Sequence, residues 1–151
     1  MYLSYDKLAN CYVCETAIQK NRAKERKQEM KFSAWYGIVV GFGMIAQWTF
    51  SIVSGGVPEF QTEPWRIGFH LAAEFSTALM LIISGIATLQ SAAWGRTALL
   101  VGLGMVIYSE IVSPGYFAQL GQWAMVSMFA VILIGAIAAV TFLLKPAGTN
   151  R

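Results

Sequence analysis

The chain has 151 residues, of which 56% are hydrophobic and only 13% are charged, with a formal net charge of +3. An average soluble domain carries roughly 25% charged residues, so this composition excludes an ordinary soluble protein. Residues 32–58 and 111–144 contain no charged side chain, and residues 67–95 contain only Glu74. Each stretch exceeds the roughly 20 apolar residues that cross a hydrocarbon core about 30 Å thick. The composition therefore predicts an all-α integral membrane protein.

The first 31 residues form a basic segment, and the excess positive charge gives no reason to expect a nucleic-acid partner. Seven of the eleven lysines and arginines lie in it: Lys7, Lys20, Arg22, Lys24, Arg26, Lys27 and Lys31. Residues 15–31 are rich in helix formers and contain neither glycine nor proline, which predicts a helix running into the first membrane span. Such a helix fits either a solvated face near anionic lipid head groups or a docking element for a partner subunit.

Cys11 and Cys14 form a single CxxC pair within this segment. A structural zinc site needs four ligands, and the chain has no second pair. A redox pair normally opens a helix in a thioredoxin-like unit, which is also missing from the sequence pattern. We therefore expect two reduced thiols that pack on one helix face. A redox or metal pair completed by a partner is the alternative.

Four spans follow, at about residues 34–53, 67–89, 95–113 and 120–144. The connections are short, which predicts antiparallel neighbours and an up-down-up-down four-helix bundle. Small residues four positions apart, such as Gly37 and Gly41, predict that helices approach closely. The sequence thus divides into the basic segment 1–31, the bundle 32–145 and a tail at 146–151.

The distribution of basic residues predicts the orientation of the bundle. Arg96, Lys145 and Arg151 would lie on the same side as the basic segment, whereas Arg66 is the only basic residue on the other side. Because cytoplasmic loops carry the excess of lysine and arginine, both termini are expected in the cytoplasm of a multi-pass protein in the cell membrane.

A cluster of polar residues is expected near the outer face of the bundle. His70 and Glu74 lie one helical turn apart near the start of the second span, and Glu110 lies near the end of the third. Polar groups are costly in lipid, so these side chains should face inward and pair with one another. The other expected members of this polar chamber are Gln47, Tyr108 and Gln122.

Three uses of the chamber remain open. His70, Glu74 and Glu110 are suitable ligands for a single transition-metal ion such as iron, manganese or zinc. They could instead relay protons or bind the head group of a quinone or another small polar ligand. The third interpretation is a buried hydrogen-bond network that only fixes the helix register. The paired Glu-x-x-His motif of di-iron bundles is missing, so a metal site would be mononuclear.

Three stretches are similar to a known group of proteins. They are VPEFQTEPWRIGFHLAAEFSTALMLIISGIATL, then AAWGR, then YSEIVSPGYFAQLGQWAMVSMF. They resemble small four-span prokaryotic membrane proteins without assigned activity. A looser similarity, through Glu74 and Gly85 in the second span, is to the DoxX-like proteins. The resemblance covers residues 32–144 and implies a helix bundle in a redox setting, without implying a catalytic residue.

These patterns favour an accessory or structural subunit of a larger membrane complex, with a redox complex among the candidates. The alternative is a homo-oligomeric membrane protein that binds a metal, a quinone or another small ligand, or that relays protons. The sequence has no nucleotide-binding loop and no nucleophile–base pair, so nothing in it indicates an enzyme. Membrane lipids and other membrane subunits are the expected partners.

Overall fold

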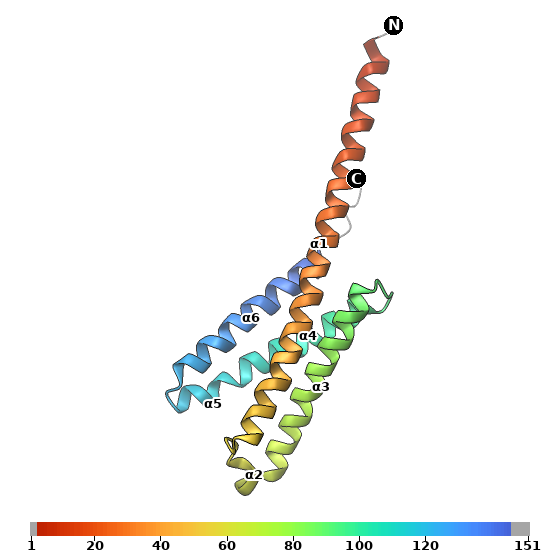
Figure 1. The fold of residues 1–151 in the computed structure, drawn as a ribbon. Helices are drawn as coiled ribbons and strands as arrows, with labels where there is room; N and C mark the ends of the chain where they lie inside the picture. The colour runs from red at the N-terminus through yellow and green to blue at the C-terminus, as the bar shows by residue number, and fades with distance from the viewer. Residues whose placement is uncertain (1–2, 146–151) are drawn as a thin grey trace.

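The structure is a computed structural model that describes the backbone of residues 3–145 and the side chains of residues 15–145. The predicted tail at 146–151 lies outside the described residues. Every regular element between residues 3 and 145 is a helix (Figure 1). The six helices are α1 (Leu3–Val53), α2 (Glu59–Thr62), α3 (Pro64–Leu89), α4 (Gly95–Val112), α5 (Pro114–Gln119) and α6 (Trp123–Leu144). The predicted all-α class is confirmed.

Four helical segments are long and apolar enough to cross a membrane. They are Glu15–Val53, Pro64–Leu89, Gly95–Gln119 and Trp123–Leu144. Many large apolar side chains on these helices are exposed, and Val53, Trp65 and Phe69 each expose more than three quarters of their surface. A soluble protein rarely leaves so much apolar surface in contact with water, whereas lipid is a suitable solvent for it.

Helix α1 has 51 residues and runs without interruption from the N-terminal segment into the predicted first span. Its N-terminal half projects well beyond the other helices (Figure 1). The segment before Gly37 contains neither glycine nor proline, so nothing in its sequence ends the helix. Cys11 and Cys14 belong to this helix, but their side chains lie outside the described residues.

Glycine and proline define several ends of the other helices. Pro64 occupies the first turn of α3 and Pro114 the first turn of α5, where the missing N–H group has no partner to lose. The fourth span was expected to begin at residue 120, but α6 begins at Trp123. Gly121 explains the difference because its φ of +70° is a left-handed conformation that interrupts the helix.

The four long helices form a ring of contacts in which α1 and α4 each pack against both α3 and α6. The core of this ring includes Ala34, Ala78, Leu81, Leu99, Leu103, Val106, Ala136 and Ala139. Glycines allow close packing, because a Cβ atom on Gly41 would lie 2.7 Å from the carbonyl oxygen of Ala78. A Cβ atom on Gly85 would lie 2.8 Å from the carbonyl oxygen of Ala34. Helices α1 and α3 therefore touch through their backbones.

Candidate functional site

Glu74 is the centre of a polar contact between three helices. It lies on the buried face of α3, which includes Leu71 and Ala78, and is itself only 8% exposed. One carboxylate oxygen accepts a hydrogen bond from the Trp48 indole N–H of α1, with a nitrogen–oxygen distance of 3.4 Å. The other oxygen accepts a hydrogen bond from the Ser109 hydroxyl of α4. Glu74 thus joins α1, α3 and α4.

Glu110 is a second buried carboxylate next to this contact. It is 5% exposed, and its Oε2 atom has no hydrogen-bond partner among the described residues. Glu74 is close enough for the charges of the two carboxylates to interact. The two ion pairs in the described part of the chain are Arg66 with Glu63 and Lys145 with Glu29, so neither buried carboxylate is paired with a cation. We call Glu74 and Glu110 the carboxylate pair.

His70 contributes to the same region through Trp48. The imidazole is partly exposed and meets the indole edge to face, with a centroid distance of 5.4 Å and an interplanar angle of 77°. Among the residues that the structure describes, no three histidine, cysteine, aspartate or glutamate side chains are arranged to hold a metal ion. The predicted metal triad of His70, Glu74 and Glu110 is therefore not assembled. The indole, by contrast, contacts both His70 and Glu74.

The remaining members of the predicted chamber are more peripheral. Tyr108 is 72% exposed, and Gln122 is exposed next to the first residue of α6. Neither joins the buried polar group. Gln47 is partly exposed on α1. These residues lie at a similar depth in the bundle, but their side chains point in different directions. Because successive helical residues point about 100° apart, Tyr108 faces outward while Glu110 faces inward.

Trp48 and Ser109 are the polar partners that the sequence reasoning missed. Trp48 follows Gly41 and Met44 at helical spacing, and both of those residues are buried. Ser109 directly precedes Glu110 and is partly buried. The inward-facing positions of α1 and α4 were therefore the signal that would have identified both residues.

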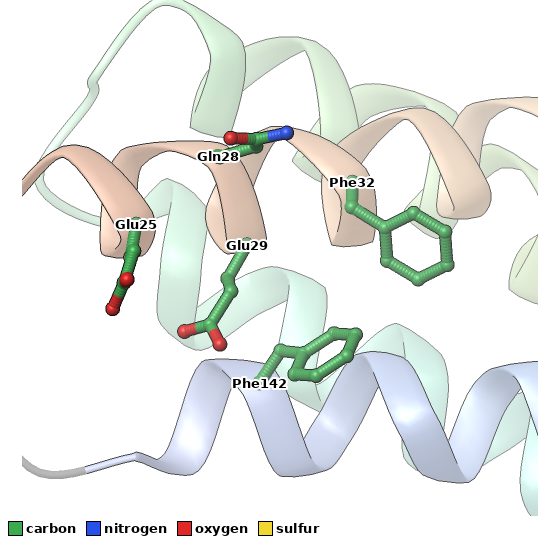
Figure 2. A pocket seen from close by; sticks show the side chains of 5 residues that line it. All are labelled: Glu25, Gln28, Glu29, Phe32 and Phe142. Atoms are coloured by element: carbon green, nitrogen blue, oxygen red, sulfur yellow. The ribbon is translucent and has the colours of Figure 1, made fainter.

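A groove between α1 and α6 lies away from the carboxylate pair. Figure 2 shows this groove, which has a volume of about 330 Å³ and is lined by Glu25, Gln28, Glu29, Phe32 and Phe142. The Lys145 ammonium pairs with Glu29 and lies 5.0 Å from the centroid of the Phe142 ring. The Lys145 ammonium therefore neutralises Glu29, and this contact holds the end of α6 against α1.

Comparisons with known proteins give one match. A family model described as a domain of unknown function, DUF8058, matches residues 27–151. The matched region contains Trp48, Glu74 and Glu110 and leaves out Cys11 and Cys14. Neither the curated proteins nor the solved structures gave a match. Because the match covers more than half of the sequence, the chain belongs to the DUF8058 family of uncharacterised domains.

Proposed function

We propose that the protein is an up-down-up-down bundle in the cell membrane with both termini in the cytoplasm. One observation supports the antiparallel order of α1 and α3, and a second supports the orientation. Along α1, Ala34, Gly41 and Trp48 follow one another, whereas their partners Gly85, Ala78 and Glu74 occur in reverse order along α3. In addition, ten of the eleven basic residues fall on one side of the bundle in this arrangement, which is the side that the positive-inside rule places in the cytoplasm.

We further propose that the carboxylate pair binds and releases a proton inside the membrane. The observation that carries this proposal is the buried Oε2 atom of Glu110, which has no hydrogen-bond partner within residues 15–145 and lies near a second buried carboxylate. Two ionised carboxylates without a cation would repel each other and would be expensive to bury in a medium of low dielectric constant. One proton held by the pair removes the repulsion and leaves a single buried charge, which hydrogen-bond donors can stabilise.

The contacts suggest a different role for each carboxylate. Trp48 and Ser109 donate hydrogen bonds to Glu74, and such donors stabilise an ionised carboxylate. Glu110 lacks comparable donors on Oε2, so it is the group that carries the proton at rest. His70 is partly exposed one turn before Glu74, and the Trp48 indole contacts both side chains. His70 therefore serves as the exchange group toward the surface.

Infrared spectroscopy of the full chain in lipid tests this proposal. A protonated carboxyl group gives a C=O absorption that is distinct from the carboxylate bands and shifts in heavy water. The native protein should show this absorption at neutral pH, and Glu110→Gln should lose it. Glu63→Gln is the matched control, because Glu63 is an exposed glutamate that pairs with Arg66, and it should leave the absorption unchanged. An unchanged C=O absorption in Glu110→Gln would contradict the proposal.

A second candidate function is that of an accessory subunit in a larger membrane complex. The observation in its favour is the projecting half of α1 (Figure 1), and nearly every side chain from residue 15 to residue 31 is exposed. A helix of this length outside a bundle gains no packing energy from its own chain, and a partner would supply it. Deleting residues 1–26 retains Glu29 and its contact with Lys145, so the bundle should stay folded. The truncated protein should no longer co-purify with its complex.

A further inference from the structure

Four lysines form a single row along the projecting half of α1. Lys20, Lys24, Lys27 and Lys31 follow one another at intervals of four, three and four residues, which places them on one face of the helix. All four side chains are exposed. None of them takes part in an ion pair with another described residue. We call this row the lysine stripe.

The carboxylates between residues 15 and 31 lie on the other side of the helix. Glu25 and Glu29 point toward α6 in Figure 2, and Glu29 pairs with Lys145. At about 100° per residue, these two glutamates lie roughly opposite the lysine stripe. No other residue that the structure describes therefore neutralises the positive charge of the stripe, and the stripe faces away from α6.

The length of the stripe argues against a purely lipid partner. Lys31 is the last charged residue before the apolar run that begins at Phe32. Lys27 lies about 6 Å farther along the helix axis, Lys24 about 10 Å and Lys20 about 16 Å. Charges are screened over about 8 Å at physiological ionic strength. Because α1 continues beyond the bundle (Figure 1), lipid head groups would neutralise Lys20 far less than Lys31 and Lys27.

We propose that the lysine stripe binds an acidic helix of a partner protein, whose aspartates or glutamates repeat at the same spacing. The inference rests on the proposed accessory role and names the face and the chemistry of the contact. A row one side chain wide and about 16 Å long matches the ridge of a second helix. A nucleic acid or a membrane surface would instead require a broader basic face. Arg22 and Arg26 do not provide it, because they lie on the same side as Glu25 and Glu29.

Two charge-reversal variants of the full chain test the contact in native membranes. Lys20→Glu with Lys24→Glu places two carboxylates in the stripe. Arg22→Glu with Arg26→Glu is the matched control, because it makes the same charge change at the same spacing on the opposite side. A carbodiimide crosslinker joins lysine amines to contacting carboxylates, and mass spectrometry then identifies the linked peptides. The native chain should link Lys20 and Lys24 to acidic residues one turn apart in one partner helix.

The two variants should differ clearly in partner retention. The stripe variant should retain about tenfold less of the linked partner, because like charges would then face each other, whereas the control should retain most of it. Equal losses in both variants would overturn the proposal, as would links confined to this chain. The proposal would also fail if Lys20 and Lys24 were protected from an amine-labelling reagent equally well in native membranes and in anionic nanodiscs that contain no protein partner. If deletion of residues 1–26 releases the partner but the stripe variant retains it, the accessory role is supported and the contact through the lysine stripe is contradicted.

Discussion

At the residue scale, the two buried carboxylates differ in their hydrogen bonds. Glu74 accepts from Trp48 and Ser109, whereas Oε2 of Glu110 has no hydrogen-bond partner among the residues that the structure describes. Removing an acceptor leaves its buried donors unsatisfied, and that loss is larger than the net value of the hydrogen bond itself. The two glutamates should therefore respond differently to the same substitution.

Glu74→Leu should lower the free energy of unfolding by about 1–3 kcal/mol, because it leaves the Trp48 N–H and the Ser109 hydroxyl without an acceptor. Glu110→Leu should leave the free energy of unfolding unchanged or raise it, since it replaces an unpaired polar group by an apolar one of similar size. Unfolding of the purified protein in mixed micelles, followed by tryptophan fluorescence, measures both values. Equal losses would contradict the difference in hydrogen bonding.

The sequence was informative about which polar residues are buried and less informative about their partners. Glu74 and Glu110 were expected to face inward because lipid disfavours a carboxylate, and both are buried. Tyr108 was included because of its depth, but its exposed position depends on the rotation of α4 about its axis. Trp48 was missed because an aromatic residue near a membrane surface is equally typical of a lipid-facing position.

At the element scale, close helix packing depends on particular glycines. Gly41 faces α3, where an added Cβ atom would meet the Ala78 carbonyl oxygen at 2.7 Å and Ile82 Cγ1 at 2.8 Å. Gly43 lies two residues later on the same helix, and nothing lies within 4 Å of the corresponding Cβ position. Alanine substitutions at Gly41 and Gly43 therefore separate the effect of helix packing from that of helix propensity.

Gly41→Ala should destabilise the bundle by about 1–3 kcal/mol, because the backbone of α3 must move to admit the methyl group. Gly43→Ala should be neutral or slightly stabilising, since alanine favours the helix and meets no neighbour. Chemical denaturation in detergent gives both values. A loss in Gly43→Ala as large as that in Gly41→Ala would show that the position of the glycine within the helix does not matter.

Arg96 links the beginning of α4 to the end of α6. Its guanidinium donates from Nε to the carbonyl oxygen of Leu143 at 3.1 Å and from a second nitrogen to the same oxygen. This carbonyl lies in the last turn of α6, where it has no partner within the helix. Arg96→Gln should therefore lower the free energy of unfolding by about 1–3 kcal/mol, measured in the same denaturation experiment.

The control for this link is Arg66→Gln. Arg66 pairs with Glu63 at 2.5 Å, but both side chains are exposed and close in sequence. An exposed ion pair contributes at most about 1 kcal/mol, so this substitution should have little effect. If Arg66→Gln matched or exceeded the loss in Arg96→Gln, the contact with Leu143 would have no special value.

The helix boundaries followed largely from the sequence, and their exceptions have local causes. The uncharged stretches predicted spans at about 67–89 and 95–113, close to α3 and α4, although α3 begins earlier, at Pro64. The start of α6 moved because a single glycine, Gly121, adopts a left-handed conformation. The short helices α2 and α5 were expected only as connections, since four to six residues carry too little periodicity to indicate a helix.

At the scale of the whole molecule, the proposed orientation can be measured directly. In a background where Cys11 and Cys14 are replaced by serine, a cysteine at Gln61 should react with a membrane-impermeant thiol reagent in intact cells. A cysteine at Lys24 should react only after permeabilisation, because the excess of basic residues keeps that side in the cytoplasm. The reverse pattern would invert the orientation and place the carboxylate pair near the inner surface.

The continuity of α1 also fixes the order in which its contacts would respond to a load. From the projecting half, α1 first meets the bundle at Glu29, which pairs with Lys145, then at Ala34, whose carbonyl oxygen lies against Gly85, and only then at Gly41. Lys20 and Trp48 lie on opposite sides of Ala34, each about 21 Å from it along the helix. The Trp48–Glu74 hydrogen bond is 3.4 Å long, so a displacement of about 1 Å away from Glu74 would break it. A load on the projecting half would therefore reach Glu74 only if it also moved α1 at Ala34 and Gly41.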